Sequence, residues 1–559
     1  MKQLIECVPN FSEGRDEKVI RQITDAIQSV DGIRLLNVDP GKATNRTVVT
    51  FVGEPYQVVE AAFRGAEMAS RLIDMSKHKG EHPRFGALDV CPLVPIANIS
   101  MEETVTFARM LAQRMGEELG IPVYCYEFAA FNENRRSLAN CRAGEYEGLK
   151  VKQLIPEWKP DFGPVEFNER SGASAVGARN FLIAYNVNLN TTSVRRANSI
   201  AFDVREAGRI KREGDPITGK IVMDEKGEPV RIPGSLARVR AIGWFIKEYG
   251  IAQISMNLTD ITVTSIHQAF AEVEERARER GIRVTGSELI GLVPLQAMLD
   301  AGRYFLRKQK RSTGIPDEEI IKIAIKSMGL DELAPFDPKK RIIEYLIDDE
   351  KDKLIDLSVE AFSNETLSES PAPGGGSVAA YVGALGAALG SMVANLSAIK
   401  RGWDDRWEEF SEWAEKGKVY HDTLLKYVSE DAAAFNAIMD AYAMPKVSEP
   451  EKMIRTNAIQ AATKHAIEVP FEVMQAAFRS MDVIQAMVMT GNPNSLSDAG
   501  VGALCARTAV YGAYLNVKIN AKGLNDKEFA NEILDKAAQL LQQAREKEAE
   551  ILSLLESKL

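Results

Sequence analysis

The chain has 559 residues, which is too long for one hydrophobic core and predicts about three domains. Hydrophobic residues make up 45% and charged residues 26%, the balance of a soluble globular protein. The formal net charge of −10 argues against a broad nucleic-acid-binding surface, which would be basic, but it leaves room for a local basic pocket that binds an anionic small molecule.

Several features of the sequence place the chain in the cytoplasm. The five cysteines form no C-x-x-C pair, which favours reduced thiols over a disulfide framework. The N-terminal segment lacks the apolar core of a signal peptide. The most apolar run, 378–394, consists largely of Ala and Gly and falls short of the ~20 strongly apolar residues of a membrane span, so we expect a buried helix there. No membrane or nucleic-acid partner is expected.

Strand and helix patterns alternate at the beginning of the chain. Helical spacing of apolar residues is clear at Ile20, Ile23 and Ile27, whereas 47–52 is rich in β-branched residues. Strands are predicted at 4–8, 33–38, 47–52, 90–96 and 123–126, and helices at 17–30, 54–73 and 102–119. This order of elements is typical of a ferredoxin-like α/β sandwich, and it predicts a sheet with one face free.

A similar order of elements follows after residue 180. Strands are predicted at 181–187, 241–245, 252–256 and 283–285, and helices at 193–205 and 265–280. We therefore predict two related α/β subdomains, at 1–180 and 181–330. The polar stretch 209–235 interrupts the second subdomain and is predicted to form an exposed hairpin or loop.

The character of the sequence changes after residue 330. Pro335, Pro338 and the charged residues 348–353 indicate a linker at 331–353. From residue 354 onward the chain is rich in Ala and Leu, and helices are predicted at 378–396, 415–442, 449–479, 500–516 and 526–557. The predicted fold is thus two ferredoxin-like α/β sandwich subdomains (1–180 and 181–330) followed by a helical bundle at 354–559.

Segment 77–89 is the first candidate site, because it places His78, His82 and several charged residues between glycines and a proline. An imidazole exchanges protons near neutral pH, and loops often carry functional side chains. Gly80 and Pro83 make a helix implausible, so the two histidines would not share one helical face as metal ligands. A solvated loop, an acid/base site and a metal site all remain open on this evidence.

The second candidate site lies in the helical region. Three glycines, Gly374 to Gly376, precede Ser377 and an Ala/Gly-rich helix, so backbone N–H groups could approach an anion there. A flexible start of the helix, with Ser377 near its N-cap, explains the same pattern. Asp431 is expected to share a buried stripe with Ala434 and Phe435, as a structurally paired or a functional carboxylate. The polar stretch 491–498 is interpreted as a turn.

Motifs along almost the whole chain resemble the formiminotransferase-cyclodeaminase family. In the first half these are residues 7–14, 38–41 with 44–47, the segment around His82, 161–164, 177–179 and 286–291. In the helical part they are Pro371 to Ser377, Asp431 with Phe435, and 512–517, which also resemble the methenyltetrahydrofolate cyclohydrolases.

The resemblance implies that the first half transfers a formimino group between glutamate and tetrahydrofolate. His82 then corresponds to the family's catalytic histidine, and Asp39 and Arg84 would orient it or hold the carboxylate of glutamate. The family's folate segment corresponds to 163–172, where Val165, Glu166 and 168–171 differ from the family pattern. The folate-binding residues implied by these motifs are Gly163, Pro164, Phe167, Gly172, Gly177 and Arg179.

For the helical part, the resemblance implies cyclisation of 5-formiminotetrahydrofolate to 5,10-methenyltetrahydrofolate with loss of ammonia. Asp431 would carry the proton, and Gly374, Gly375, Gly376 and Ser377 would contact the folate. Tetrahydrofolate, in its polyglutamylated form, is the implied co-substrate, no metal is expected, and family members are homo-oligomers. Basic residues at 307–311 could attract a polyglutamate tail or simply be a solvated helix end.

Three functional hypotheses remain open from the sequence. The first is the bifunctional enzyme just described. The second pairs a glutamate formyltransferase with a methenyltetrahydrofolate cyclohydrolase, because an amidine and an amide donor would require similar residues. The third is a folate-binding scaffold without catalytic activity, and the intact motifs around His82 and Asp431 count against it.

Overall fold

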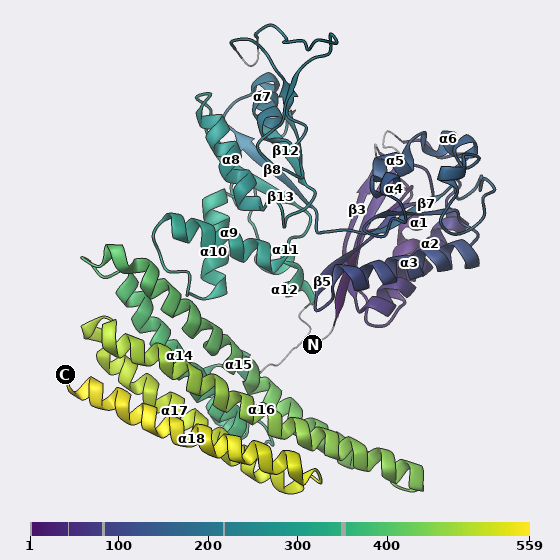
Figure 1. Ribbon diagram of the computed structural model, residues 1–559. Coiled ribbons are helices and arrows are strands. Elements are labelled where there is room, and N and C mark those ends of the chain that lie inside the picture. Colours follow the sequence, from purple (N-terminus) through teal and green to yellow (C-terminus); the bar gives the residue numbers. More distant parts are fainter. Residues whose placement is uncertain (1–2, 43, 81–83, 216–217, 348–353) are drawn as a thin grey trace. The chain divides into compact units, whose positions relative to one another are not determined.

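A computed structural model describes residues 3–42, 44–80, 84–215, 218–347 and 354–559 (Figure 1). The chain divides into two compact units. One comprises Met1–Met298 and Met328–Asp348, and the other comprises Leu299–Ser327 and Asp349–Leu559. The first unit is mixed α/β and the second is helical, so the predicted succession of α/β and helical parts is confirmed at that level.

The first sheet has seven strands. Strands β1 (Leu4–Cys7) and β2 (Asn10–Phe11) together form one interrupted strand between β4 (Arg46–Gly53) and β5 (Leu88–Ala97), and all of these pairings are antiparallel. β3 (Arg34–Gly41) extends the sheet beyond β4. β7 (Ser174–Ala178) joins β5 in parallel, and β6 (Val123–Glu127) joins β7.

Three helices cover one face of this sheet, and their local signals are readable in the sequence. α1 (Glu17–Gln28) begins at Asp16, whose side chain accepts the N–H groups of Lys18 and Val19. α2 (Pro55–Leu72) begins with proline, and α3 (Met101–Glu118) has a capping box of Ser100 and Glu103. Apolar residues of these helices and the sheet form one buried core.

The expectation of a free second face is wrong for this sheet. Tyr124, Tyr126 and Val90 point to the other side, where they pack with Cys141 and Leu149. Cys141 belongs to α5 (Leu138–Arg142) and Leu149 to α6 (Glu145–Lys152). The sequence analysis predicted neither of these short helices, nor α4 (Glu133–Arg136) before them. Their polar, short sequence carries no clear helical periodicity, which explains the omission.

The second sheet, of four strands, has the order β11-β12-β8-β13 and is antiparallel throughout. Its strands are β8 (Ile183–Leu189), β11 (Val239–Ile246), β12 (Ile251–Leu258) and β13 (Val284–Ile290). The helices α7 (Val194–Val204) and α8 (Ile266–Arg278) connect them. Between α7 and β11, β9 (Arg209–Ile210) pairs with β10 (Arg231–Ile232), so the predicted hairpin in the polar stretch is confirmed.

The second unit is built from long helices. The bundle consists of α14 (Gly375–Ala398), α15 (Trp407–Ala443), α16 (Glu449–Thr490), α17 (Leu496–Asn520) and α18 (Lys527–Glu556). Ala, Val and Met residues of these helices fill its core. Part of α9 (Leu295–Lys308) and α10 (Asp317–Met328) belongs to this unit, and Gly314 between them accepts a hydrogen bond from Asn395 Nδ2 at 2.8 Å.

One helix among the described residues, α14, is long and apolar enough to cross a membrane by length and composition. In its most apolar window, 61% of the residues are buried within the structure. Small residues such as Gly383 and Ala387 let neighbouring helices approach α14 closely. These contacts identify it as a core helix, as the composition of 378–394 predicted.

Candidate functional sites

Three motif segments of the first half meet in one tight cluster of loops. The side chain of Asn45, which has a φ of 49°, accepts the N–H of Gly14 at 3.0 Å and donates to the carbonyl of Lys79 at 3.1 Å. A Cβ atom on Gly80 would lie 2.2 Å from the backbone oxygen of Thr44. Position 80 therefore has room only for glycine, and Asn45 fixes the start of the segment that leads to residue 82.

Arg84 is held by three residues on two other parts of the chain, His78 and the glutamates at the start of α6. Its Nη1 and Nη2 atoms donate to Glu147 at 3.0 and 2.8 Å, and Nη1 also donates to Glu145 at 3.1 Å. Its Nε atom donates to His78 Nδ1 at 3.3 Å, and Nη2 donates to the His78 carbonyl at 3.4 Å. These five bonds use all five N–H groups of the guanidinium. Arg84 therefore stabilises the conformation of the loop.

His78 has no nitrogen left for proton transfer. Nδ1 accepts from Arg84, so the proton resides on Nε2, which lies 2.8 Å from the carbonyl oxygen of Asn45. Of the two histidines in the segment, His78 thus has a structural role. His82, the candidate catalytic residue, lies outside the described residues.

The predicted folate segment contacts the segment that follows His82. Gly172, with a φ of +66°, would place a Cβ only 2.1 Å from the Phe85 carbonyl oxygen. The N–H of Ala173 donates to that oxygen at 2.9 Å, and Ser12 Oγ donates to the carbonyl of Gly86 at 2.7 Å. Segments far apart in sequence, around residues 12, 86 and 172, therefore form one site.

Other predicted folate residues lie at varying places around this sheet. Phe167 packs on Tyr146, with 5.4 Å between the ring centroids, and the N–H of Tyr146 donates to the Arg84 carbonyl at 3.0 Å. Gly163 lies beside Ile121, and Gly177 lies against the ring of Tyr126. The guanidinium of Arg179 donates to the carbonyl of Asn180 at 3.0 Å. Phe167 and Gly172 are thus the residues of this set that join the loop cluster.

Asp39 lies on β3, opposite Val48 of β4, and its side chain is exposed. Its carboxylate makes no hydrogen bond or ion pair within the described part of the chain. It therefore remains available to an external group, whereas the donors of Arg84 are occupied.

Two buried carboxylates near these motifs were missed by the sequence analysis. Asp89 is fully buried, accepts the N–H of Phe85 at 2.9 Å and pairs with Arg142. Burial nevertheless raises the pKa of Asp89. Glu6 is 3% exposed, and burial raises its pKa to about 7, while the charge of Arg179 opposes the shift. A charged residue within the apolar strand Leu4–Cys7 was the signal for Glu6.

In the helical unit, the structure brings Asp431 of α15 to the N-terminus of α14. The hydroxyl of the buried Ser377 donates to Asp431 Oδ2 at 3.0 Å. A Cβ on Gly376 would lie 2.0 Å from Asp431 Oδ1. Only glycine at position 376 lets the carboxylate approach the helix this closely, so the glycine turn and the aspartate, predicted separately, form one site.

Burial raises the pKa of Asp431, and the hydrogen bonds from the hydroxyl and backbone N–H of Ser377 lower it only in part. The carboxyl group therefore holds a proton at a higher pH than an exposed aspartate. A group with this property can give a proton to a departing amine and take it back.

A third motif of the helical part reaches the same place. Asn516 of α17 donates to the Gly512 carbonyl at 3.0 Å, and its Nδ2 atom would lie 3.9 Å from a Cβ on Gly375. Gly375 is exposed, so the site opens to solvent at this point. The predicted stripe holds for Ala434, which is 3% exposed, but is wrong for Phe435, which is 42% exposed.

No group of three or more His, Cys, Asp or Glu side chains suited to hold a metal ion occurs among the residues with assigned positions. His78 is occupied by its two hydrogen bonds. The expectation of a metal-free site remains a prediction.

Comparison with protein families assigns all three parts of the chain. Residues 4–179 match the N-terminal subdomain of the formiminotransferase domain, and residues 184–348 match the formiminotransferase domain. Residues 358–539 match the model described as formiminotransferase-cyclodeaminase. The loop cluster lies in the range 4–179, and the Asp431 site lies in the range 358–539.

Three relatives cover the whole chain or one of its parts. Formimidoyltransferase-cyclodeaminase of Mus musculus is 44% identical over 560 residues, with both chains covered completely. Glutamate formimidoyltransferase of Thermoplasma acidophilum is 43% identical over 54% of this chain and 92% of its own. Methenyltetrahydrofolate cyclohydrolase of Methylorubrum extorquens is 38% identical over 36% of this chain and 97% of its own.

Proposed function

Because this chain belongs to the formiminotransferase-cyclodeaminase family, we propose that it catalyses two consecutive reactions of folate-bound one-carbon units. The first half transfers a formimino group between glutamate and tetrahydrofolate. The helical part cyclises 5-formiminotetrahydrofolate to 5,10-methenyltetrahydrofolate and releases ammonia. The observation that carries the proposal is the contact of Asp431 with Gly376 and Ser377 at an accessible helix N-terminus.

The second reaction requires a proton at the leaving nitrogen. The N10 atom of the folate attacks the formimino carbon and forms a bond to it. N10 loses its proton in this step, and the former imino nitrogen gains two protons in all, equivalent to the one released by N10 and one taken up from solvent. The C–N bond to that nitrogen then breaks, and it leaves as ammonia. Asp431 relays a proton to the leaving nitrogen, because its half-buried carboxyl group has a raised pKa and Ser377 holds its Oδ2 atom in place.

The first reaction also moves a proton between two nitrogens. The N5 atom of tetrahydrofolate attacks the amidine carbon of formiminoglutamate, and the glutamate nitrogen leaves from the tetrahedral adduct. We assign the proton transfer to His82 on the basis of its motif. Arg84 acts as a positioning residue, since Glu145, Glu147 and His78 engage its donors, and Asp39 is the carboxylate left to orient the imidazole.

The experiment separates the two reactions on the full-length protein. Transfer is followed with formiminoglutamate and tetrahydrofolate, and cyclisation is followed with 5-formiminotetrahydrofolate through methenyl absorbance and ammonia. His82→Ala should abolish transfer and spare cyclisation, and Asp431→Asn should do the reverse. Loss of both activities in both folded variants would refute the division of labour.

A second candidate function rests on the relative from Methylorubrum extorquens, a methenyltetrahydrofolate cyclohydrolase that matches the helical part. In that case the carboxyl group of Asp431 would serve the opening of the methenyl ring by water, and the first half would accept a formyl group. Comparing formiminoglutamate with formylglutamate as donors, and ammonia release with methenyl hydrolysis, distinguishes the two functions.

Further properties are proposed with this function. The order β3-β4-β1-β5, repeated as β11-β12-β8-β13, supports two ferredoxin-like subdomains, the first of which β7 and β6 extend. The domain boundaries near 180, 330 and 353, a polyglutamylated folate, a metal-free mechanism, a homo-oligomer and a cytoplasmic location remain proposals from the sequence and its family resemblance.

A further inference from the structure

The inserted segment between α7 and β11 encloses a cavity of about 470 Å³ against α7. The segment has defined pairing: β9 with β10, Arg212 with Ile221, and Met223 with Pro229. Nine residues line the cavity, and five of them are arginines, whereas none carries a carboxylate. The lining residues are Arg195, Asn198, Ser199, Phe202, Arg205, Arg209, Ile210, Arg212 and Arg231.

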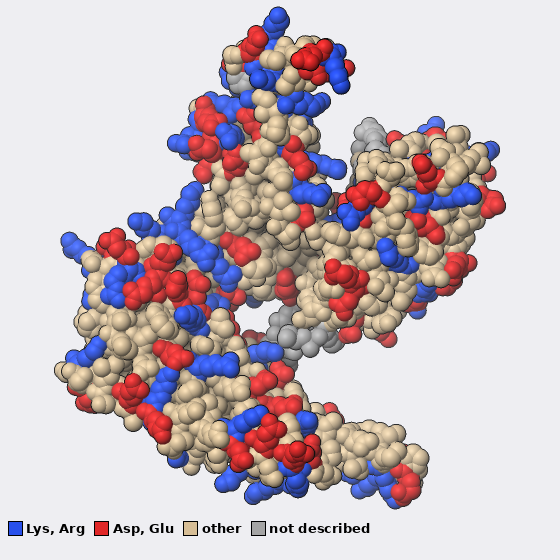
Figure 2. Space-filling model, viewed as in Figure 1, with Lys and Arg blue, Asp and Glu red and all other residues tan. Residues whose placement is uncertain are grey.

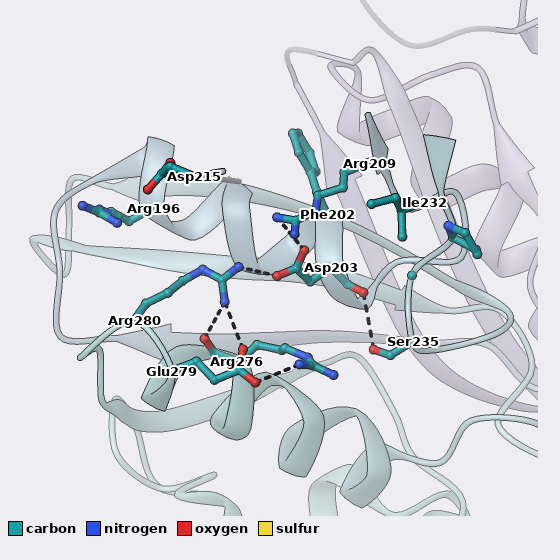
Figure 3. Close-up of a pocket in the computed structure, with 12 residues that line it drawn as sticks. Arg196, Phe202, Asp203, Arg209, Asp215, Ile232, Ser235, Arg276, Glu279 and Arg280 are labelled. Carbon is teal, nitrogen blue, oxygen red and sulfur yellow. Dashed lines mark hydrogen bonds and ion pairs between the residues drawn. The ribbon is translucent and has the colours of Figure 1, made fainter. Parts of the chain in front are cut away.

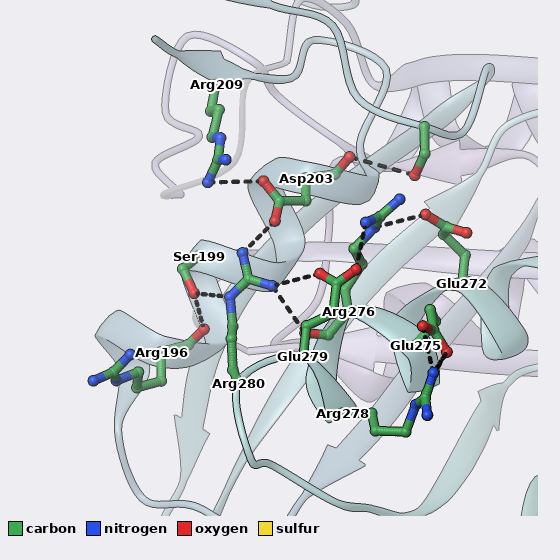
Figure 4. Close-up of polar contacts among 11 residues, drawn as sticks. Arg196, Ser199, Asp203, Arg209, Glu272, Glu275, Arg276, Arg278, Glu279 and Arg280 are labelled. Carbon is green, nitrogen blue, oxygen red and sulfur yellow. Dashed lines mark hydrogen bonds and ion pairs between the residues drawn. The ribbon is translucent and has the colours of Figure 1, made fainter. Parts of the chain in front are cut away.

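A neighbouring cavity of about 570 Å³ shows what a charge-balanced site looks like in the same subdomain (Figure 3). There Asp203 pairs with both Arg209, at 2.9 Å, and Arg280. Arg276 pairs with Glu272 and Glu279, at 2.9 and 2.8 Å (Figure 4). These arginines have carboxylate partners within the protein, so this cavity has little need of an external anion.

The arginines of the smaller cavity are compensated less completely. Arg205, Arg212 and Arg231 form no ion pair with a carboxylate within the described ranges of the chain. Arg205 donates to the Gly208 carbonyl at 2.9 Å and Arg212 to the Gly219 carbonyl at 2.8 Å, so backbone atoms hold their guanidinium groups in place. Burial, and then the charge of Arg231, lowers the pKa of Arg205, which indicates that two like charges are held near each other.

The surrounding surface does not share this bias. Figure 2 shows acidic and basic side chains interspersed over the inserted segment at the top of the view. On the face in view, the inserted segment therefore carries both signs of charge, unlike the lining of the cavity. Phe202 adds an aromatic surface, with the guanidinium carbon of Arg205 4.0 Å from the centre of its ring. Guanidinium groups on a helix and a paired hairpin match the geometry of phosphate and carboxylate oxygens.

We propose that this cavity binds a small molecule with two or more oxyanion charges, a phosphate ester or a polycarboxylate, through residues that belong to neither proposed reaction centre. The bound anion neutralises Arg205, Arg212 and Arg231 and thereby removes the repulsion between neighbouring guanidinium groups. The inserted segment is in this view a binding element, because it contributes Arg209, Arg212 and Arg231 to the cavity.

Isothermal titration of the full-length protein with pyrophosphate, and separately with citrate, tests the proposal. Saturable binding of either anion at one site per chain is expected, and the preferred anion identifies phosphate or carboxylate as the source of the charge. Arg231→Gln should weaken that binding about tenfold, the loss expected for one charge-assisted hydrogen bond. Higher ionic strength should also weaken anion binding to the unsubstituted protein.

Arg283→Gln is the matched control, because it removes the charge of another exposed arginine on the same subdomain. Its effect should stay below about twofold if the binding is local. Arg231 is exposed, so its substitution should leave the unfolding temperature and both enzymatic activities unchanged. Absence of saturable binding by either anion, or equal weakening in both variants, would overturn the proposal.

Discussion

Replacing Gly376 by alanine should disable the Asp431 site without unfolding the bundle. The added Cβ would lie 2.0 Å from Asp431 Oδ1, whereas ordinary contacts begin at 3.4 Å, so the carboxylate must retreat by about 1.4 Å. The displaced atom is the end of a side chain, which can rotate away at modest cost. Misplacement of a catalytic group by about 1 Å can reduce the rate about 100-fold, and we expect a loss of that order in kcat for cyclisation.

Gly375→Ala provides the matched control for this prediction. The two glycines are adjacent at the start of α14, so both substitutions change helix propensity by similar amounts, about 1 kcal/mol or less. A Cβ at position 375 would have Asn516 Nδ2 as its nearest neighbour, at 3.9 Å, which is an ordinary contact. A larger loss of cyclisation in Gly376→Ala than in Gly375→Ala therefore reports the position of Asp431, whereas a contact of the folate with Gly375 would weaken both variants.

The assay is cyclisation of 5-formiminotetrahydrofolate, with the transferase rate measured on the same preparations. We expect Gly375→Ala to retain cyclisation within a few-fold, Gly376→Ala to lose it, and both to retain transfer. Equal cyclisation rates in the two variants would refute the idea that close approach of Asp431 to α14 matters for the reaction.

Three further predictions concern buried carboxylates and the loop cluster. Burial raises the pKa of Asp431, so the folded state holds the proton more tightly, and stability is lost as the pH rises through the folded-state pKa. Asp431→Asn should therefore raise the unfolding temperature more at pH 8 than at pH 5. An equal gain at both pH values would contradict this. Glu6 has a pKa of about 7 against an ordinary 4.5, so its carboxylate should also lower stability at high pH. Glu6→Gln should raise the free energy of unfolding, measured with denaturant, by up to about 3 kcal/mol above pH 7. This gain should vanish toward pH 4.5. Gly80→Ala would place a Cβ 2.2 Å from the Thr44 carbonyl oxygen, a backbone atom, and should reduce transfer about tenfold or more while cyclisation stays unchanged; unaltered transfer would show that this loop contact is dispensable.

Periodicity predicted most elements of this fold well. The apolar stripes of α1, α2, α14, α17 and α18 were found within a few residues of their ends, because burial of one face dictates the spacing of apolar residues. The helix α15 begins eight residues before its predicted start, and α16 continues eleven residues beyond its predicted end. β7, the helices α4 to α6 and the helices α9 and α10 were missed. The strand β7 consists of small residues with no alternation, and the short helices are stabilised by contacts with Tyr124 and Val90 that no local pattern encodes.

The residues of the candidate sites were predictable, but their partners were not. The motif around residue 80 suggested two similar histidines, yet the contacts with Arg84 and Asn45 give His78 a structural role. Likewise, Arg84 resembled a substrate-binding residue until Glu145 and Glu147, about sixty positions away, were seen to engage its guanidinium. Sequence spacing carries no information on such pairings, since they depend on how distant loops close.

The contact between Gly376 and Asp431 shows why a site of this kind lowers the stability of the fold. Close packing on α14 removes water from the carboxylate, which disfavours its charged form and raises its pKa. The same packing that lowers stability at neutral pH is what gives the group a proton to donate, and Ser377 offsets only part of the cost. A variant that relieves this packing should therefore gain stability and lose cyclisation activity together. A purely structural aspartate would give no such link between the two quantities.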